Sequence, residues 1–311
     1  MKTIKIITWI ILALTFSGKL SAQQDPMYSM YMLDKMLINP AYAGSSNWVV
    51  ATAKYREQFL GIEGNPVTKT FNLHFPVQKK HIGFGLKVVS DELGVSKNRN
   101  ITMLYTYHLN LAGGKLSAGV ELGVFDRVIN YTDLILSTPA DAAIPVSNAS
   151  STVPDASWGI YYQKKQWYMG FSDAHIVKVN FKSYGLTPSH AHLYNHLYFL
   201  AGRVFSLSDK WTFEPSALVK YQAAAPVQVD VNGLITFRDR VGIGVQYRSG
   251  DAVAAMLKIN ILENLRIAYS YDMTISGLSP YSRGCHEIIL SYGIKLPPPP
   301  SEKEIHPRYY F

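Results

Sequence analysis

The amino-acid sequence predicts an all-β fold, a transmembrane outer-membrane β-barrel of about 14 antiparallel strands. Only 17% of the 311 residues are charged, fewer than the roughly 25% of ordinary soluble domains. After the first residues, however, the sequence contains no run of the ~18 apolar residues that a membrane-spanning helix needs. Apolar and polar residues instead alternate with a period of two. This pattern is typical of strands that face lipid on one side and a lumen on the other.

Residues 1–22 have the features of a secretory signal peptide. Lys2 and Lys5 form a basic start, residues 6–16 form a short apolar stretch, and Ala22 is a small residue at the expected cleavage point. We therefore expect this segment to be removed on export. The single cysteine of the chain excludes an internal disulfide framework.

Residues 23–46 are expected to form an N-terminal segment that plugs the barrel or lies in the periplasm. The segment ends in Asn39-Pro40-Ala41-Tyr42-Ala43-Gly44-Ser45. Pro40 fixes its own φ angle, and Gly44 can adopt a positive φ, so the heptad predicts a tight turn. The simpler alternative is an ordinary loop before the first strand.

Residues 47–296 are expected to form the barrel. On the strand predicted at 241–248, for example, Val241 and Ile243 share one face and Gly242 and Gly244 share the other. Turns at 238–240, 249–251 and 262–264 separate the tenth to the thirteenth strand. The other predicted strands span residues 48–59, 67–75, 82–88, 101–109, 116–124, 158–162, 167–172, 197–207, 211–221, 241–248, 265–272 and 288–294.

The lengths of the connections support an even number of strands. Every connection from an even-numbered strand to the next is about five residues or shorter, whereas the long ones, 128–155 and 174–192, follow odd-numbered strands. Outer-membrane barrels have short periplasmic turns and longer extracellular loops. The sorting of connections by parity therefore favours a barrel over a soluble sandwich.

The composition of the two strand faces also fits a barrel. Glycine and small polar residues share the predicted lumen side: Gly83, Gly119, Gly123, Gly242, Gly244, Thr102, Ser117 and Ser270. Aromatic residues near strand ends predict girdles at the membrane interfaces: Trp48, Tyr55, Trp158, Tyr161, Trp167, Tyr168, Trp211, Tyr221, Tyr247, Tyr271 and Tyr281. For any single aromatic residue, packing in a soluble β core is the alternative.

Residues 297–311 are expected to form a proline-rich periplasmic tail. The tail begins with four consecutive prolines, which cannot join a sheet ladder. Its aromatic end is a recognition tag or an assembly signal, or else an untethered terminus.

The sequence carries no motif of an enzyme. Patterns typical of serine hydrolases, zinc proteases, P-loops and dinucleotide-binding folds do not occur. We therefore predict a protein that is not an enzyme and assign no catalytic, cofactor-binding or metal-binding residues and no cofactor. Asp25 and the pair Asp91-Glu92 are interpreted as isolated, solvated loop acids.

Histidines suggest one alternative. His190, His192 and His196 would project from the same side of an extended segment and could bind a metal ion. Because no acidic or cysteine ligand lies near them in the sequence, exposed loop histidines are the preferred interpretation. The net charge of +8 comes without a basic run of five residues, so we expect contact with outer-membrane lipid and lipopolysaccharide and no nucleic-acid partner.

Four stretches carry a resemblance to a known family. They are Gln24-Asp25-Pro26-Met27-Tyr28-Ser29-Met30-Tyr31, the heptad at 39–45, Tyr55-Arg56-x-Gln58-Phe59 and Gly83-Phe84-Gly85. With them, nearly the whole chain resembles the PorP/SprF family of outer-membrane proteins of type IX secretion and gliding motility in Bacteroidota. The resemblance singles out a partner or plug signature: Asp25, Pro26, Tyr28, Asn39, Pro40, Ala41, Tyr42, Ala43 and Gly44.

The resemblance implies a non-enzymatic component of the bacterial outer membrane. Such a protein would bind or anchor large secreted adhesins through their C-terminal sorting domain and contact the periplasmic secretion and motility ring. An alternative is a FadL-like channel for hydrophobic solutes, because Asn39-Pro40-Ala41 also resembles the hatch of those channels. The small and polar lumen residues count against a greasy passage. A purely structural barrel is the third possibility.

Overall fold

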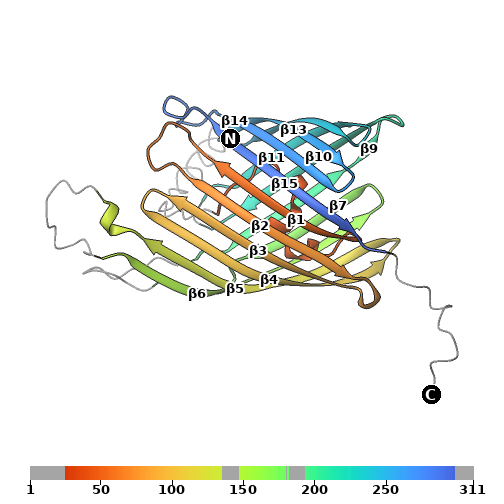
Figure 1. The fold of residues 1–311 in the computed structure, drawn as a ribbon, viewed down its shortest axis with the longest axis horizontal. Helices are drawn as coiled ribbons and strands as arrows, with labels where there is room; N and C mark the ends of the chain where they lie inside the picture. Colours follow the sequence, from red (N-terminus) through yellow and green to blue (C-terminus); the bar gives the residue numbers. More distant parts are fainter. Residues whose placement is uncertain (1–24, 135–146, 180, 182–192, 224, 298–311) are drawn as a thin grey trace, which may run out of the picture.

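The computed structural model describes residues 25–134, 147–179, 181, 193–223 and 225–297, which form one closed antiparallel barrel of 14 strands (Figure 1). β9 continues β8 after a break at Val204, so these two elements make one crossing. The strands are β1 (Trp48–Glu57), β2 (Val67–Val77), β3 (Ile82–Leu93), β4 (Ser96–Leu111), β5 (Gly114–Ile129), β6 (Ala149–Lys164), β7 (Trp167–Ala174), β8 (His196–Arg203), β9 (Phe205–Ser206), β10 (Trp211–Tyr221), β11 (Gln228–Phe237), β12 (Val241–Arg248), β13 (Ala252–Leu262), β14 (Leu265–Thr274) and β15 (Cys285–Lys295).

The remaining elements are single 3-10 turns: η1 (Tyr31–Leu33), η2 (Lys35–Leu37), η3 (Pro40–Tyr42), η4 (Gln78–Lys80) and η5 (Tyr131–Asp133). Within the described ranges, no helix is long and apolar enough to span a membrane.

The barrel closes where the first strand pairs with the last. β1 runs antiparallel to β15 from Trp48↔Lys295 to Glu57↔His286, and every other strand pairs with its neighbours along the chain. No described strand is therefore left with a free edge. Closure satisfies the backbone N–H and C=O groups within the wall, as a lipid environment requires.

The predicted faces are confirmed. Along β12 the side chains of Ile243 and Val245 are 66% and 64% exposed, whereas Gln246 and Arg248 are buried. β4 and β5 alternate in the same way. The apolar face points outward toward lipid, and the glycine and polar face points into the lumen.

The two ends of the barrel differ as predicted. One end, here called the short-turn end, carries the tight connections at 112–113, 165–166 and 263–264. The opposite, long-loop end carries the connections at 130–148 and 175–195. In barrels of this kind the short turns face the periplasm. The strands β4, β5 and β6 have 16 residues each, and β5 and β6 extend farthest at the long-loop end (Figure 1).

One predicted loop is wrong in part. The sequence suggested a connection at 128–155, but β5 continues to Ile129 and β6 begins at Ala149, opposite it in the ladder. The serine-rich run and Pro154 favour a loop locally. Pairing with β5 and a regular alternation of buried and exposed side chains override that preference.

Several predicted features lie outside the described residues. They are the signal peptide at 1–22, the tail at 297–311 except Pro297, and the histidines His190 and His192.

Candidate functional site

The barrel lumen contains residues 25–46, here called the luminal segment, drawn in red inside the ring of strands (Figure 1). It begins at the long-loop end, where Asp25 meets the ends of β7 and β8. It ends at the short-turn end, where the Ser45 carbonyl accepts a hydrogen bond of 3.0 Å from Lys115 Nζ. Of the two predicted positions, the lumen and the periplasm, the described part of the segment occupies the lumen.

Asn39 fixes the turn that ends this segment. Its side-chain amide donates to the carbonyls of Ile160 (2.9 Å) on β6 and Phe171 (3.1 Å) on β7. Its Oδ1 accepts from the backbone N–H of Ala41 (2.9 Å), which caps η3. An Asn cap followed by proline at the first helical position is the local chemistry that starts such a turn.

The turn packs backbone against backbone with the wall. A Cβ atom on Gly119 of β5 would lie 2.5 Å from the nitrogen of Ala41. Gly44 has a φ of +66°, and a Cβ atom there would lie 2.6 Å from the Cα atom of Gly83. Glycine is required on both surfaces because there is no room for a side chain. The positive φ predicted for Gly44 is therefore observed.

Ser29 forms the second anchor, at the centre of a buried ionic network. Its Oγ accepts from Arg56 Nη1 (2.9 Å) and Arg248 Nη2 (3.0 Å) and donates to Asp272 (2.5 Å). Its backbone N–H donates to Glu287 (2.8 Å). Arg56 also pairs with Asp272 at 2.8 Å and Glu287 at 3.0 Å. The charged side chains are at most 2% exposed, and each is paired, as buried charges must be.

Sequence reasoning did not find this network. Arg56 lies in a stretch of the family resemblance, and the period of two along β12, β14 and β15 accounts for the lumen side of Arg248, Asp272 and Glu287. Nothing local indicated that these strands meet Ser29, which is 258 residues from Glu287.

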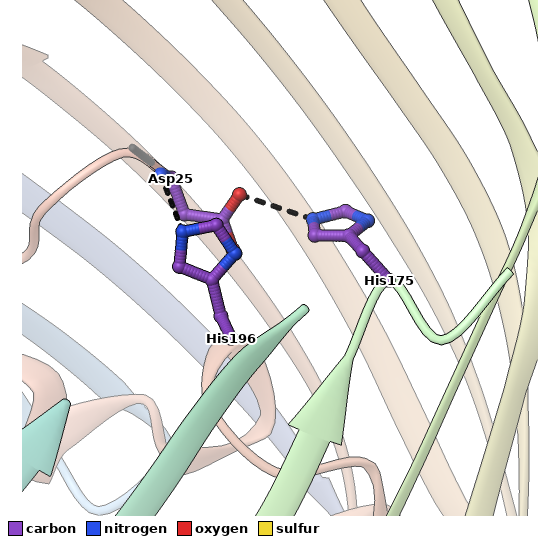
Figure 2. A group of neighbouring side chains, drawn as sticks. All are labelled: Asp25, His175 and His196. Carbon is purple, nitrogen blue, oxygen red and sulfur yellow. Dashed lines mark hydrogen bonds and ion pairs between the residues drawn. The ribbon is translucent and has the colours of Figure 1, made fainter. Parts of the chain in front are cut away.

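Asp25 forms the third anchor, at the long-loop end (Figure 2). Its carboxylate lies 3.0 Å from His175 Nε2 and accepts a hydrogen bond of 2.9 Å from the Tyr198 hydroxyl. Its backbone nitrogen lies 3.4 Å from His196 Nε2. His175 Nδ1 in turn contacts Asp155 Oδ1 at 2.9 Å. The prediction of an isolated, solvated Asp25 is therefore wrong. The sequence does not reveal the cluster because His175 and His196 lie far from Asp25 along the chain.

The opposite charges in this cluster stabilise the ionised forms of Asp25 and His175. Burial alone would raise the pKa of Asp25, but His175 and His196, with the hydrogen bond from Tyr198, hold it well below its usual range. Burial alone would lower the pKa of His175, but the carboxylates of Asp25 and Asp155 raise it to about 10. At neutral pH, Asp25 is therefore ionised and His175 is protonated.

Aromatic side chains complete the wall around the segment. Tyr161 and Tyr168, predicted to lie in interfacial girdles, are 2% and 5% exposed and face the lumen. Tyr42 packs edge-to-face on Tyr161 with ring centroids 5.4 Å apart. Lys35 Nζ lies 4.3 Å from the centre of the Tyr168 ring, a favourable cation–π distance. Their position near strand ends predicted a place in the girdles at the membrane interfaces. The structure places both rings in the lumen instead.

Small cavities remain beside the segment. A cavity of about 80 Å³ at the long-loop end is lined by Asp25, Tyr28 and His175, among others. One of about 330 Å³ toward the short-turn end is lined by Asp34 and Trp48, among others. The luminal segment lies between them.

The nine signature residues fall into two groups. Asp25, Pro26 and Tyr28 lie at the long-loop end, and residues 39–44 lie toward the short-turn end. Six of the nine are buried, and Asp25, Pro26 and Tyr42 are partly exposed. The contacts described above are with the barrel wall.

Comparisons with known proteins give one family match. The model of a family described as type IX secretion system membrane protein PorP/SprF matches residues 20–292. The CymD monoaromatic hydrocarbon channel is 13% identical, with 90% of this chain and 97% of that chain covered and a TM-score of 0.47. A Pseudomonas aeruginosa FadL homologue is 13% identical, with 83% and 92% covered and a TM-score of 0.47. Comparison with curated proteins finds no match.

Proposed function

This outer-membrane chain belongs to the PorP/SprF family of type IX secretion system membrane proteins, and from that premise we propose that it is a non-enzymatic binding partner for secreted adhesins. In this proposal the barrel holds large surface adhesins through their C-terminal sorting domain. The observation that carries the proposal is the filled lumen, which presents surfaces at its two ends and leaves little room for a passage.

The anchors of the luminal segment support this reading. Asp25, Ser29 and Asn39 bind the wall at successive depths, through ion pairs and hydrogen bonds of 2.5–3.4 Å. The cavity of about 80 Å³ at the long-loop end has room for a few water molecules. A protein chain would have to displace the whole segment to pass.

The long-loop end is the proposed binding surface for cargo. β5 and β6 extend there, and connecting loops on a rigid scaffold are the usual sites of partner binding. Exposed apolar side chains in its described connections suit a protein partner: Ile176, Val227, Ile275, Leu278 and Tyr281. We further infer that the short-turn end, where β15 ends at Lys295, contacts the periplasmic secretion and motility ring.

Binding of a purified adhesin C-terminal sorting domain to the full-length protein in detergent micelles tests the proposal. We expect saturable binding that Tyr281→Asp and Leu278→Asp weaken at least tenfold, because each places a charge on the apolar surface. Lys79→Glu at the short-turn end is the control and should bind as the wild type does. Absence of binding, or equal loss in the control, would contradict this role.

The uptake of hydrophobic solutes makes a different prediction. A FadL-like channel should carry fatty acids or small aromatic compounds into liposomes that contain the purified protein. The filled lumen predicts no more flux than in protein-free liposomes. Specific, saturable flux would favour the channel over the adhesin partner.

A further inference from the structure

We propose that Asp25, His175 and His196 bind a divalent transition-metal ion of the zinc class, which ties the start of the luminal segment to the barrel wall. The three residues come from three separate places, the luminal segment, the residue after β7 and the first residue of β8. Their side chains point toward one another (Figure 2). The proposal does not depend on the proposed function.

The donor set fits this class of ion. Two imidazoles and one carboxylate offer nitrogen and oxygen ligands, a combination common at zinc sites. Calcium and magnesium prefer all-oxygen sites and are disfavoured by the two histidines. One ligand atom from each residue lies within 4.8 Å of the others.

An oxygen atom lies against the Nδ1 atom of each histidine, as it commonly does behind a metal-binding histidine. His175 Nδ1 lies 2.9 Å from the Asp155 carboxylate, which Asn100 holds through a hydrogen bond of 2.6 Å. His196 Nδ1 lies 2.9 Å from the carbonyl oxygen of Tyr194. Each contact occupies Nδ1. The free Nε2 of His175 faces the Asp25 carboxylate at 3.0 Å, and Nε2 of His196 faces the Asp25 backbone nitrogen at 3.4 Å. A carboxylate or carbonyl behind the ligating ring is the usual second layer of a metal site.

The geometry needs only a small adjustment. Bonds of about 2.0–2.1 Å to a tetrahedral ion place its ligand atoms about 3.3 Å apart. His175 Nε2 and Asp25 Oδ1 are already 3.0 Å apart. The ligand atoms of the three residues lie within 4.8 Å of one another, so the widest separation would have to shorten by about 1.5 Å when the ion binds. The ion would replace the proton between His175 and Asp25.

The site would keep one position for water. Three protein ligands leave the fourth place of a tetrahedral ion open. The cavity of about 80 Å³ and a smaller one of about 40 Å³ both include Asp25 in their lining, and the first reaches His175 while the second reaches His196. A water ligand therefore has space on either side.

The experiment measures zinc binding by the full-length protein, purified with a tag that contains no histidine and stripped with EDTA. Titration calorimetry should show one high-affinity zinc ion per chain, and zinc should raise the unfolding temperature above that in EDTA. Asp25→Asn and His175→Ala should each weaken binding at least 100-fold. Asp155→Asn keeps all three ligands and should weaken binding about 10–100-fold.

Two controls separate this site from other histidines. His81→Ala removes a histidine from a turn at the short-turn end and should leave the affinity unchanged. The double variant His190→Ala/His192→Ala should also bind as the wild type does. An ordinary ion pair without metal predicts no stoichiometric zinc binding and equal stability in zinc and EDTA. That result, or wild-type affinity in Asp25→Asn, would overturn the proposal.

Discussion

Replacing Asn39 by alanine tests whether a few polar contacts hold the luminal segment in the barrel. The substitution removes two hydrogen bonds to the wall and the cap of η3, at 2.9, 3.1 and 2.9 Å. A typical intramolecular hydrogen bond contributes about 1 kcal/mol net. The three together should lower the free energy of local opening by about 3 kcal/mol, which is about 100-fold in the opening equilibrium.

Hydrogen exchange measures this opening directly. The amides of Tyr42, Ala43 and Ser45 donate to carbonyls of the same turn, at 3.1, 3.2 and 3.1 Å. In Asn39→Ala we expect them to exchange about 100-fold faster, because exchange requires the turn to open. Peptides from β12 on another part of the wall should exchange at an unchanged rate.

Asn47→Ala is the matched control, since Asn47 is exposed and lies just after the luminal segment. It should leave the exchange of the turn unchanged. If Asn39→Ala changes the exchange of these amides by less than about threefold, Asn39 does not hold the turn and the reasoning from its hydrogen bonds fails.

Three further substitutions test the wall around the segment. Gly119→Val should push η3 from its place, because a Cβ atom would lie 2.5 Å from Ala41, and ion current should appear in planar bilayers. Arg56→Ala removes the nearest cation from the buried carboxylates of Asp272 and Glu287, at 2.8 and 3.0 Å. It should lower the free energy of unfolding by about 3–5 kcal/mol, measured by urea titration in micelles. Tyr168→Phe removes a hydrogen bond of 2.9 Å to Glu214 and should cost about 2 kcal/mol in the same titration.

Each of these substitutions has a control elsewhere on the chain. Gly277→Val, where a Cβ atom would meet nothing within 4 Å, should give no current. Arg240→Ala in an exposed turn and Tyr221→Phe on the outer face should leave the unfolding midpoint unchanged. Equal effects in a substitution and its control would show that the contact in question does not act as described.

The strands could be predicted because their pattern is local. The predicted limits 211–221 and 241–248 coincide with β10 and β12, since turn residues and a period of two mark each strand within its own sequence. The start of β6 could not be found in this way. Its pairing with β5 joins residues on the two sides of a long connection, and that pairing decides where the strand begins.

The site shows the same division. The Asn39 cap lies in one short stretch, and its turn chemistry is visible there. The clusters around Ser29 and Asp25 are not local, because Asp25 meets a histidine 150 residues away. Alternation tells on which face a side chain lies, but not at which height in the barrel or opposite which residue. The sequence therefore predicts a solvated Asp25, whereas the structure places it in a charged cluster.

The path of the luminal segment places the two ends of the described chain on opposite sides of the membrane. Fourteen strands and one pass through the lumen make an odd number of crossings, so Asp25 lies on the side of the long loops and Lys295 on the side of the short turns. An epitope inserted ahead of Asp25 should therefore bind antibody on intact cells, whereas one placed after Lys295 should not. Because the segment ends at the short-turn end and β1 begins there, the chain reverses its direction between Ser45 and Trp48.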